Sequence, residues 1–397
     1  MNLFLLSFFL VYGSLHAYAL LKARSALALA PGATLALLPL LGILLCAPIV
    51  TYQLSRHGYE GAARIVANVG YLWMGFLFFL TCLNLSADLL RLPLGAMGRG
   101  GIAANAAAAL AGRSAFLCIA GLAVALSAYA MVEASRIEVV RVRIVTDRLP
   151  ASVPSLRVAQ ITDLHLGLVH RNGKAREVAA IVSREHPDLL VSTGDLVDGQ
   201  LDGVAELAEI LRRIPARRGK FAVLGNHEYY AGIDRAIAFT RKSGFTLLRD
   251  ETVTVDDAVR IVGVDDPAGA RFGRLAGPSE AALLGNRPDG LFTVLLKHRP
   301  PLDAGSAGRF DLQLSGHTHD GQIFPFRLLT RLVYPLLAGN HPSPGGGILH
   351  VSRGTGTWGP PMRFLAPPEI TVVEIVASVS AGSTIRGTIP GKWRGVP

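Results

Sequence analysis

The sequence is poor in charge and in cysteine. Only 17% of its 397 residues are charged, whereas a soluble globular protein carries about 25%. Half of the residues are hydrophobic and the mean hydropathy is +0.39, which excludes intrinsic disorder and argues against one ordinary soluble domain. The three cysteines all lie in the first 118 residues, so the rest of the chain has neither disulfides nor a thiolate metal site.

The sequence also lacks a concentrated basic region in its polar half, although its net charge is +10. The excess of Lys and Arg lies mainly in residues 1–150 and in the last twenty residues, and the region between them is nearly neutral. Binding to a nucleic-acid backbone depends on clustered positive charge. We therefore expect no nucleic-acid partner.

Long apolar runs fill the first third of the chain. Four of them are long enough to cross a hydrocarbon core of about 30 Å as helices, and they are separated by short basic loops, which disfavours buried helices of a soluble protein. They cover residues 2–21, 34–54, 65–90 and 114–132. The pattern predicts a four-helix transmembrane domain over residues 1–135. Asp88, the one acid inside these runs, lies near an end, and the absence of charge pairs within the spans disfavours transport.

These runs predict a multi-pass integral protein of the cell membrane. Basic residues are divided almost equally between the two sets of loops, so the positive-inside rule does not decide the orientation. We give a slight preference to the outside for the second half of the chain.

The pattern changes after a charged, β-rich connector at residues 136–154. Short apolar runs then alternate with amphipathic segments through residues 155–376, which is typical of an α/β domain. The last part, residues 377–397, is basic and rich in Gly, Ser and Thr, and it is predicted to be a disordered tail.

Polar residues follow five successive predicted strands of this domain. In α/β folds, ligands gather where strands end and loops begin. Each motif alone is weak, since a Gly-Asp pair is usually a turn and a single His usually belongs to the core. A joint set of imidazoles and hard oxygen ligands suits a borderline divalent metal such as Mn, Fe or Zn. The residues are Asp163, His165, Asp195, Asp198, Asn226, His227, Glu228, His298, His317 and His319.

In order and spacing, this series resembles the calcineurin-like metallophosphoesterase family. Four apolar segments ahead of such a domain also resemble its membrane-anchored branch, the transmembrane proteins with a metallophosphoesterase domain. The resemblance implies a four-layer α/β/β/α sandwich with two divalent metal ions. It implies that Asp163, His165 and His319 bind the first ion. It assigns Asn226, His298 and His317 to the second ion, with Asp195 bridging both.

The resemblance also implies a mechanism, in which a metal-bridging hydroxide attacks the phosphorus of a phosphoester, most simply a phosphodiester. His227 would donate a proton to the leaving oxygen, Asp198 would orient His227, and Glu228 would support the site. An alternative substrate is a lipid-linked nucleotide diphosphate or a phospholipid, cleaved by a pyrophosphatase reaction. A different alternative is a metal-binding scaffold without turnover.

The sequence does not decide the roles of two features. The apolar insertion at residues 324–337 is either an interfacial element that contacts membrane lipid, or a helix packed on the sheet or against the spans. Tyr229 and Tyr230 either line the substrate pocket or pack at the start of a helix. Anchoring in the membrane favours a phosphoester substrate that is itself in or near the membrane.

Overall fold

The computed structural model describes residues 3–96, 101–199, 205–286, 290–378 and 386–387. These residues divide into two units, one of residues 1–133 with 359–362, and one of residues 134–358 with 363–397. Most of the predicted disordered tail, 377–397, lies outside the described residues. Each unit is described here by itself.

The N-terminal unit is helical. Four of its helices are long and apolar enough to cross a membrane, judged by length and composition, and a shorter helix lies between the third and the last of them. The helices are α1 (Leu3–Leu27), α2 (Pro31–Arg56), α3 (Glu60–Ala96), α4 (Gly101–Ala111) and α5 (Arg113–Ala134).

Asp88, the one acid inside the predicted apolar runs, contacts basic residues that end two of these runs. Helix α1 continues past the predicted end of its apolar run, so that Lys22 lies inside the helix. Its Nζ atom is 2.5 Å from Oδ1 of Asp88 on α3, and Arg91 contacts the same oxygen at 3.2 Å. The Tyr18 hydroxyl donates a hydrogen bond to Asp88 at 2.7 Å. Asp88 is therefore stabilised by three partners. Arg91 lies three residues along the same helix, and Lys22 and Tyr18 come from α1.

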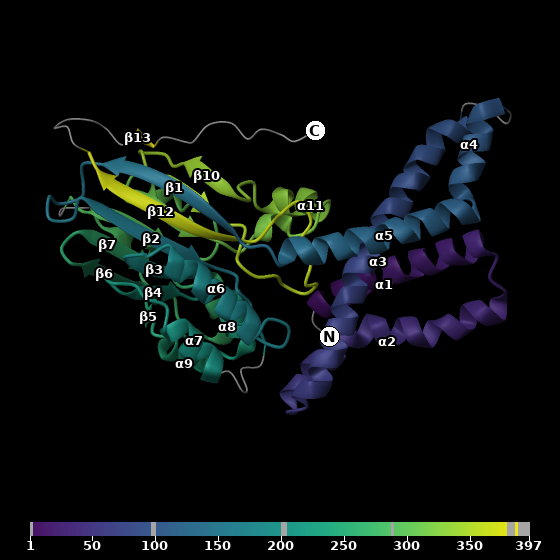
Figure 1. Cartoon of the computed structure of the whole chain (residues 1–397), viewed down its shortest axis with the longest axis horizontal. Coiled ribbons are helices and arrows are strands. Elements are labelled where there is room, and N and C mark those ends of the chain that lie inside the picture. The colour runs from purple at the N-terminus through teal and green to yellow at the C-terminus, as the bar shows by residue number, and fades with distance from the viewer. Residues whose placement is uncertain (1–2, 97–100, 200–204, 287–289, 379–385, 388–397) are drawn as a thin grey trace. The chain divides into compact units, whose positions relative to one another are not determined.

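The C-terminal unit is built on two β-sheets (Figure 1). The seven-stranded sheet has the order β13 (Arg386–Gly387), β1 (Glu138–Thr146), β12 (Glu369–Ala377), β2 (Ser155–Ile161), β3 (Leu189–Thr193), β4 (Lys220–Val223) and β5 (Thr246–Leu247). The six-stranded sheet has the order β10 (Gly339–Pro342), β11 (Ile348–Val351), β9 (Leu312–Ser315), β8 (Phe292–Leu296), β7 (Val259–Gly263) and β6 (Glu251–Val255).

The two-residue period of the strands produces separate cores on the two faces of the first sheet. In β2, Leu156 and Val158 point into the core shared with the second sheet, together with Val294 of β8. Ala159 and Ile161 of the same strand point into the core beneath the helices. This outer layer contains α6 (Asn172–Arg184), α7 (Ala205–Arg212), α8 (Asn226–Ala231) and α9 (Ile233–Lys242).

A thinner layer lies on the far side of the second sheet. There α10 (Glu280–Leu284) contributes Leu284 to a small core with Val262 and Leu295 of the sheet. The arrangement is the predicted α/β/β/α sandwich, in which the helices cover the two outer faces and the sheets face each other.

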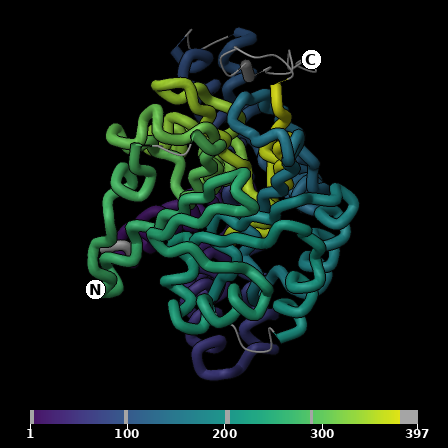
Figure 2. Tube along the Cα trace, turned by 90° about the vertical axis from the view of Figure 1, so that its left-hand side faces the viewer, coloured from purple at the N-terminus to yellow at the C-terminus, as the bar shows by residue number. Residues whose placement is uncertain are grey.

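The segment predicted to be a connector, 136–154, contains strand β1. This strand pairs in parallel with β12 from Glu138–Glu369 to Thr146–Ala377. Figure 2 shows the blue and yellow segments from the two ends of the unit side by side. The strand belongs to the sheet of the α/β unit, and its partner is more than two hundred residues away, so no local pattern indicated the pairing.

Candidate metal centre

The predicted site residues follow strands that are parallel neighbours. Strands β2, β3 and β4 run in parallel in one sheet, and β8 and β9 run in parallel in the other. The carboxyl ends of parallel neighbours meet at one edge, where ligands bind in α/β folds. The structure brings the residues after these strands together: Asp163, His165, Asp195, Asp198, Asn226, His227, His298, His317 and His319.

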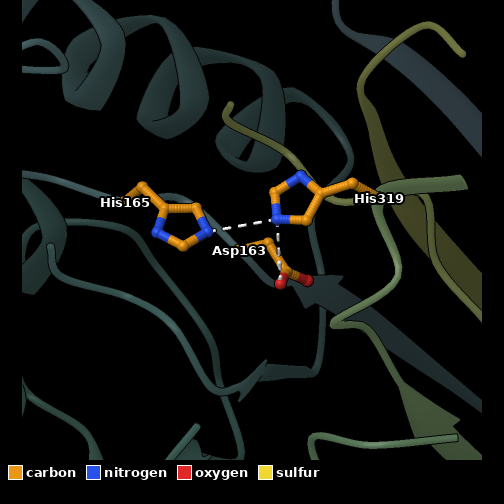
Figure 3. Close-up of side chains that lie close together, drawn as sticks. All are labelled: Asp163, His165 and His319. Carbon is orange, nitrogen blue, oxygen red and sulfur yellow. Dashed lines mark hydrogen bonds and ion pairs between the residues drawn. The ribbon is translucent and has the colours of Figure 1, made fainter. Parts of the chain in front are cut away.

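The first group contains Asp163, His165 and His319, which are all buried. Their ligand atoms lie within 4.8 Å of one another. The Nε2 atom of His319 is 3.4 Å from Oδ1 of Asp163 and 3.1 Å from Nε2 of His165 (Figure 3). Three atoms that can each offer a lone pair therefore face a common point, as the ligands of a cation do.

The second group contains Asp195, His298 and His317, with the same 4.8 Å limit. The Nδ1 atom of His298 is 2.9 Å from the carbonyl oxygen of Thr193, which can only accept, so Nδ1 carries a proton. The Nε2 atom is then directed at Oδ2 of Asp195 (3.2 Å) and Nδ1 of His317 (3.0 Å). A carbonyl that fixes the tautomer of a histidine is typical of metal ligands.

Asp195 connects the two groups. Its Oδ2 atom is 3.9 Å from Nε2 of His165, and a third group of potential ligands combines Asp195, His165 and His227. Among the described residues, the buried amide oxygen of Asn226 has no hydrogen-bond partner, and the same is true of Nδ1 of His165. Buried polar atoms normally have partners. Such orphaned atoms beside converging imidazoles and carboxylates fit divalent metal ions.

The electrostatics of the site favour the ligand forms of its side chains. Burial lowers the pKa of His165 and of His317 to about 3, so both rings are neutral. Burial raises the pKa of the Asp163 and Asp195 carboxyls, but the neighbouring histidines outweigh it and hold both below their usual range. Burial lowers the pKa of His298, but the Asp195 carboxylate raises it to about 10. A metal ion would supply the positive charge that this proton supplies.

His227 lies beside the metal groups and has a carboxylate of its own. Its Nδ1 atom is 2.9 Å from Oδ1 of Asp198, and its backbone N–H donates to Oδ1 of Asp195 at 2.8 Å. Two exposed aromatic rings border it, Tyr230 at 5.4 Å and Trp358 at 5.7 Å between centroids. Tyr229, by contrast, is buried, and its hydroxyl accepts a hydrogen bond from Arg249. Tyr230 therefore lies at the site, whereas Tyr229 packs in the interior.

The loops that carry the ligands have an unusual backbone. Asp163, His165, Asp195, His317 and His319 all have φ between 49° and 73°, a region that non-glycine residues rarely adopt. Glycines give the carboxylates room: a Cβ atom on Gly225 would lie 2.1 Å from Oδ1 of Asp195, and one on Gly316 would lie 2.2 Å from Oδ2 of Asp163. Backbone strain of this kind is concentrated at functional sites.

Glu228 holds two of these loops together. Its buried carboxylate accepts hydrogen bonds from the backbone N–H groups of Asp195, Leu196 and Val197 after β3, and of Gly225 after β4. The four bonds are between 2.7 and 3.2 Å long. Glu228 therefore supports the loop of Asp195.

Sequence reasoning missed Arg363, which is fully buried behind the first metal group. Its guanidinium donates to the carbonyl oxygens of Gly356 (2.6 Å) and Ala366 (3.0 Å) and lies 3.1 Å from Nδ1 of His319. Burial lowers the pKa of Arg363 to about 10, which leaves it charged. The available signal was a single basic residue within the largely apolar segment 359–366.

The calcineurin-like phosphoesterase family model matches residues 156–321. A metallophosphoesterase of Aquifex aeolicus is 40% identical over 64% of this chain and 97% of its own length. A zebrafish (Danio rerio) protein named transmembrane protein with metallophosphoesterase domain is 32% identical over 75% of this chain and 69% of its own length. Among solved structures, a dimetal phosphatase from Danio rerio is 13% identical over 51% of this chain and 88% of that chain, with a TM-score of 0.35.

Proposed function

Because this chain belongs to the calcineurin-like metallophosphoesterase family, we propose that it is a membrane-anchored hydrolase of phosphodiesters. The observation that carries the proposal is the set of three connected ligand groups, two of which share Asp195 and one of which includes His227. The four apolar helices, together with relatives named as transmembrane proteins, support the anchor. A scaffold without turnover would not need the paired His227 and Asp198.

Two sets of residues would hold the two metal ions. Asp163, His165 and His319 would hold one ion, and Asn226, His298 and His317 would hold the other, with Asp195 between them. Two bound divalent ions supply Lewis acidity to a phosphoryl group and lower the pKa of water.

His227 would supply the proton that the leaving group needs. Its Nδ1 is engaged by Asp198, which leaves Nε2 to give a proton to the leaving oxygen of the ester. Asp198 fixes the ring plane and stabilises the imidazolium form before transfer. This pair is what distinguishes a hydrolytic site from a passive metal site.

The surroundings of His227 favour an ester with an organic leaving group. Tyr230, Trp358 and Phe272 are each about half exposed, and the Tyr230 ring contacts both His227 and Phe272. Exposed aromatic rings at the side where the leaving oxygen would be protonated offer an apolar contact to the group that departs. The same rings would offer a contact to the organic group of a lipid-linked nucleotide diphosphate, our alternative substrate.

The test uses the full chain in detergent, stripped of metal and reloaded with Mn²⁺, Zn²⁺ or Fe²⁺. Hydrolysis of bis-p-nitrophenyl phosphate is compared with that of a monoester, and metal content is measured by mass spectrometry. For Asp195→Asn we expect loss of bound metal and a fall in kcat of at least about 100-fold. The matched control is Asp257→Asn, an exposed residue with φ of 49° against 51° for Asp195.

Two results would contradict the proposal. One is full activity of the Asp195→Asn variant, which would exclude the shared carboxylate from the reaction. The other is a metal-loaded, folded protein that hydrolyses neither diesters nor monoesters nor lipid pyrophosphates. Preference for the monoester over the diester would correct the substrate class and leave the metal centre in place.

A further inference from the structure

The apolar insertion forms a short amphipathic helix whose apolar side is exposed. Helix α11 (Phe326–Val333) places its large apolar side chains on one side and its polar side chains on the other, by the 3.6-residue period. Leu332 is 80% exposed and Val333 is 71% exposed, and no residue of the helix is buried. The apolar side consists of Phe326, Leu328, Leu329, Leu332 and Val333, and the polar side of Arg327, Thr330 and Arg331.

This exposure contradicts packing of the insertion on the sheet, one of the possibilities left open by the sequence. A helix packed on the sheet would bury its apolar side, as α9 buries Ala236 and Phe239. Phe324, just before α11, is also exposed and extends the apolar patch along the chain. Contiguous apolar surface of this kind marks a site of contact with a partner or with membrane lipid.

We propose that the apolar side of α11 lies in the interfacial layer of the bilayer. The occupant follows from the chain itself, because four helices long and apolar enough to span a membrane hold this unit at a bilayer. The polar side carries Arg327 and the exposed Arg331 and has no acidic residue. Basic residues opposite an apolar side are typical of helices that lie in the plane of an anionic membrane surface.

Helix α11 is fastened to the metal-binding loop at both ends. Near its start, Nε of Arg327 is 3.0 Å from Oδ1 of Asp320, the residue after His319. At its end, the hydroxyl of Tyr334 is 2.9 Å from Nε2 of His317. Beyond it, the Thr318 hydroxyl donates to the carbonyl oxygen of Leu337. Whatever depth α11 reaches in the membrane therefore fixes the position of the metal-binding loop relative to the lipid head groups.

The consequence for substrate class rests on the proposed function. A phosphodiester at head-group level would reach the metal groups without leaving the membrane surface. The substrate class is then a lipid phosphodiester or diphosphate, recognised in the plane of the bilayer.

The test measures the environment of α11 in the full chain and does not depend on activity. The native Cys46, Cys82 and Cys118 are replaced by Ala, and Leu332→Cys is labelled with a small fluorophore in nanodiscs containing phosphatidylglycerol and phosphatidylcholine. Quenching by iodide in water is compared with quenching by spin-labelled lipid. The matched control is Arg331→Cys, which lies directly before Leu332 in the sequence but on the polar side of the helix. Leu328→Cys is a second probe of the apolar side.

We expect the probes at 332 and 328 to be quenched by the spin-labelled lipid and to be several-fold less accessible to iodide than the probe at 331. Equal access of iodide to all three probes would overturn the proposal, because α11 would then face water. Shielding of 332 and 328 from both quenchers would also overturn it, because protein would then cover the helix. Either result is obtained whether or not the protein hydrolyses a phosphodiester, so the two proposals fail separately.

Discussion

Replacement of Asp198 by Asn tests how the protonation of His227 is controlled. Asn keeps an oxygen that can accept from Nδ1 of His227, at the position where Asp198 lies 2.9 Å away, but it removes the negative charge. If His227 is the proton donor, this change lowers its pKa and so reduces the fraction of His227 that is protonated, without removing the ring. Metal ligands are untouched, because Asp198 belongs to none of the three ligand groups.

The size of the effect follows from the electrostatics around the ring. Burial by itself lowers the pKa of His227, but the Asp195 and Asp198 carboxylates raise it from 6.5 to about 9. This corresponds to about 3 kcal/mol in favour of the imidazolium. Asp195 contributes to this stabilisation, and the Asp198 side chain is 38% exposed and screened by water, so its share is roughly 1 to 2 kcal/mol. At a pH above the pKa of His227, the expected loss in kcat is therefore about 10-fold, because the protonated fraction falls by that factor.

The pH dependence of kcat gives a second expected result, whose sign is fixed. A general acid is active while protonated, so activity falls as the pH rises through the pKa of His227. Bound cations lower this pKa equally in both proteins, whereas loss of the Asp198 charge lowers it only in the variant. The alkaline limb of the kcat profile should therefore move to lower pH by about one unit. A diester with an alkoxide leaving group should lose more activity than bis-p-nitrophenyl phosphate, whose leaving group needs little protonation.

The assay records kcat against pH for both diesters, with metal content measured in parallel and Asp257→Asn as the control. An unmoved alkaline limb, or equal losses for good and poor leaving groups, would refute the assignment of His227 as the acid. A fall in metal content would show instead that Asp198 supports metal binding.

Two further substitutions test the construction of the site. Gly225→Ala would place a Cβ atom 2.1 Å from Oδ1 of Asp195 and displace the shared carboxylate, so we expect loss of metal and a fall in kcat of about 100-fold, with Gly173→Ala, where the added atom meets nothing within 4 Å, as the control. Unchanged metal content and kcat would mean that the loop adapts. Arg363→Met would leave the carbonyl oxygens of Gly356 and Ala366 without their buried donor, so at about 1 to 3 kcal/mol for each unsatisfied acceptor we expect a loss of about 2 to 6 kcal/mol in the free energy of unfolding, measured by denaturant titration in detergent against the exposed Arg331→Met. A difference between the two variants below about 0.5 kcal/mol would refute the bracing role.

The sequence indicated the ligand residues because their positions depend on a local pattern. Asp163 and Asp195 each follow a short apolar strand, and the carboxyl ends of parallel strands meet at one edge. His298, for example, follows strand β8, Phe292–Leu296, as expected of a residue at the end of a strand. The roles of the individual ligands remain predictions, because the geometry brings these residues together without distinguishing a ligand from a neighbour. His227, for example, is close enough to Asp195 and His165 to belong to a ligand group.

What the sequence did not indicate depends on contacts between distant segments. The pairing of β1 with β12 joins residues 138–146 to residues 369–377, and the periodicity of neither strand specifies its partner. Arg363 stabilises the site through backbone carbonyls, which leave no trace in the sequence. The charge pair of Lys22 with Asp88 likewise joins two helices. The amphipathic pattern of α11 was visible, but whether its apolar side is covered is a property of the folded surface.

The strained backbone of the site must be held in place by the rest of the fold. Five of the predicted ligands have left-handed φ values, and each such residue costs about 1 kcal/mol or more when it is not glycine. The Nε2 atoms of His165 and His319 also face each other at 3.1 Å. This geometry persists only if the surrounding structure imposes it, and the contacts that do so are on the chain: the four bonds accepted by Glu228 and the buried guanidinium of Arg363. In small zinc domains the metal organises its ligands and folding depends on it. Here the two-sheet core and these braces position the predicted ligands through contacts of the chain itself.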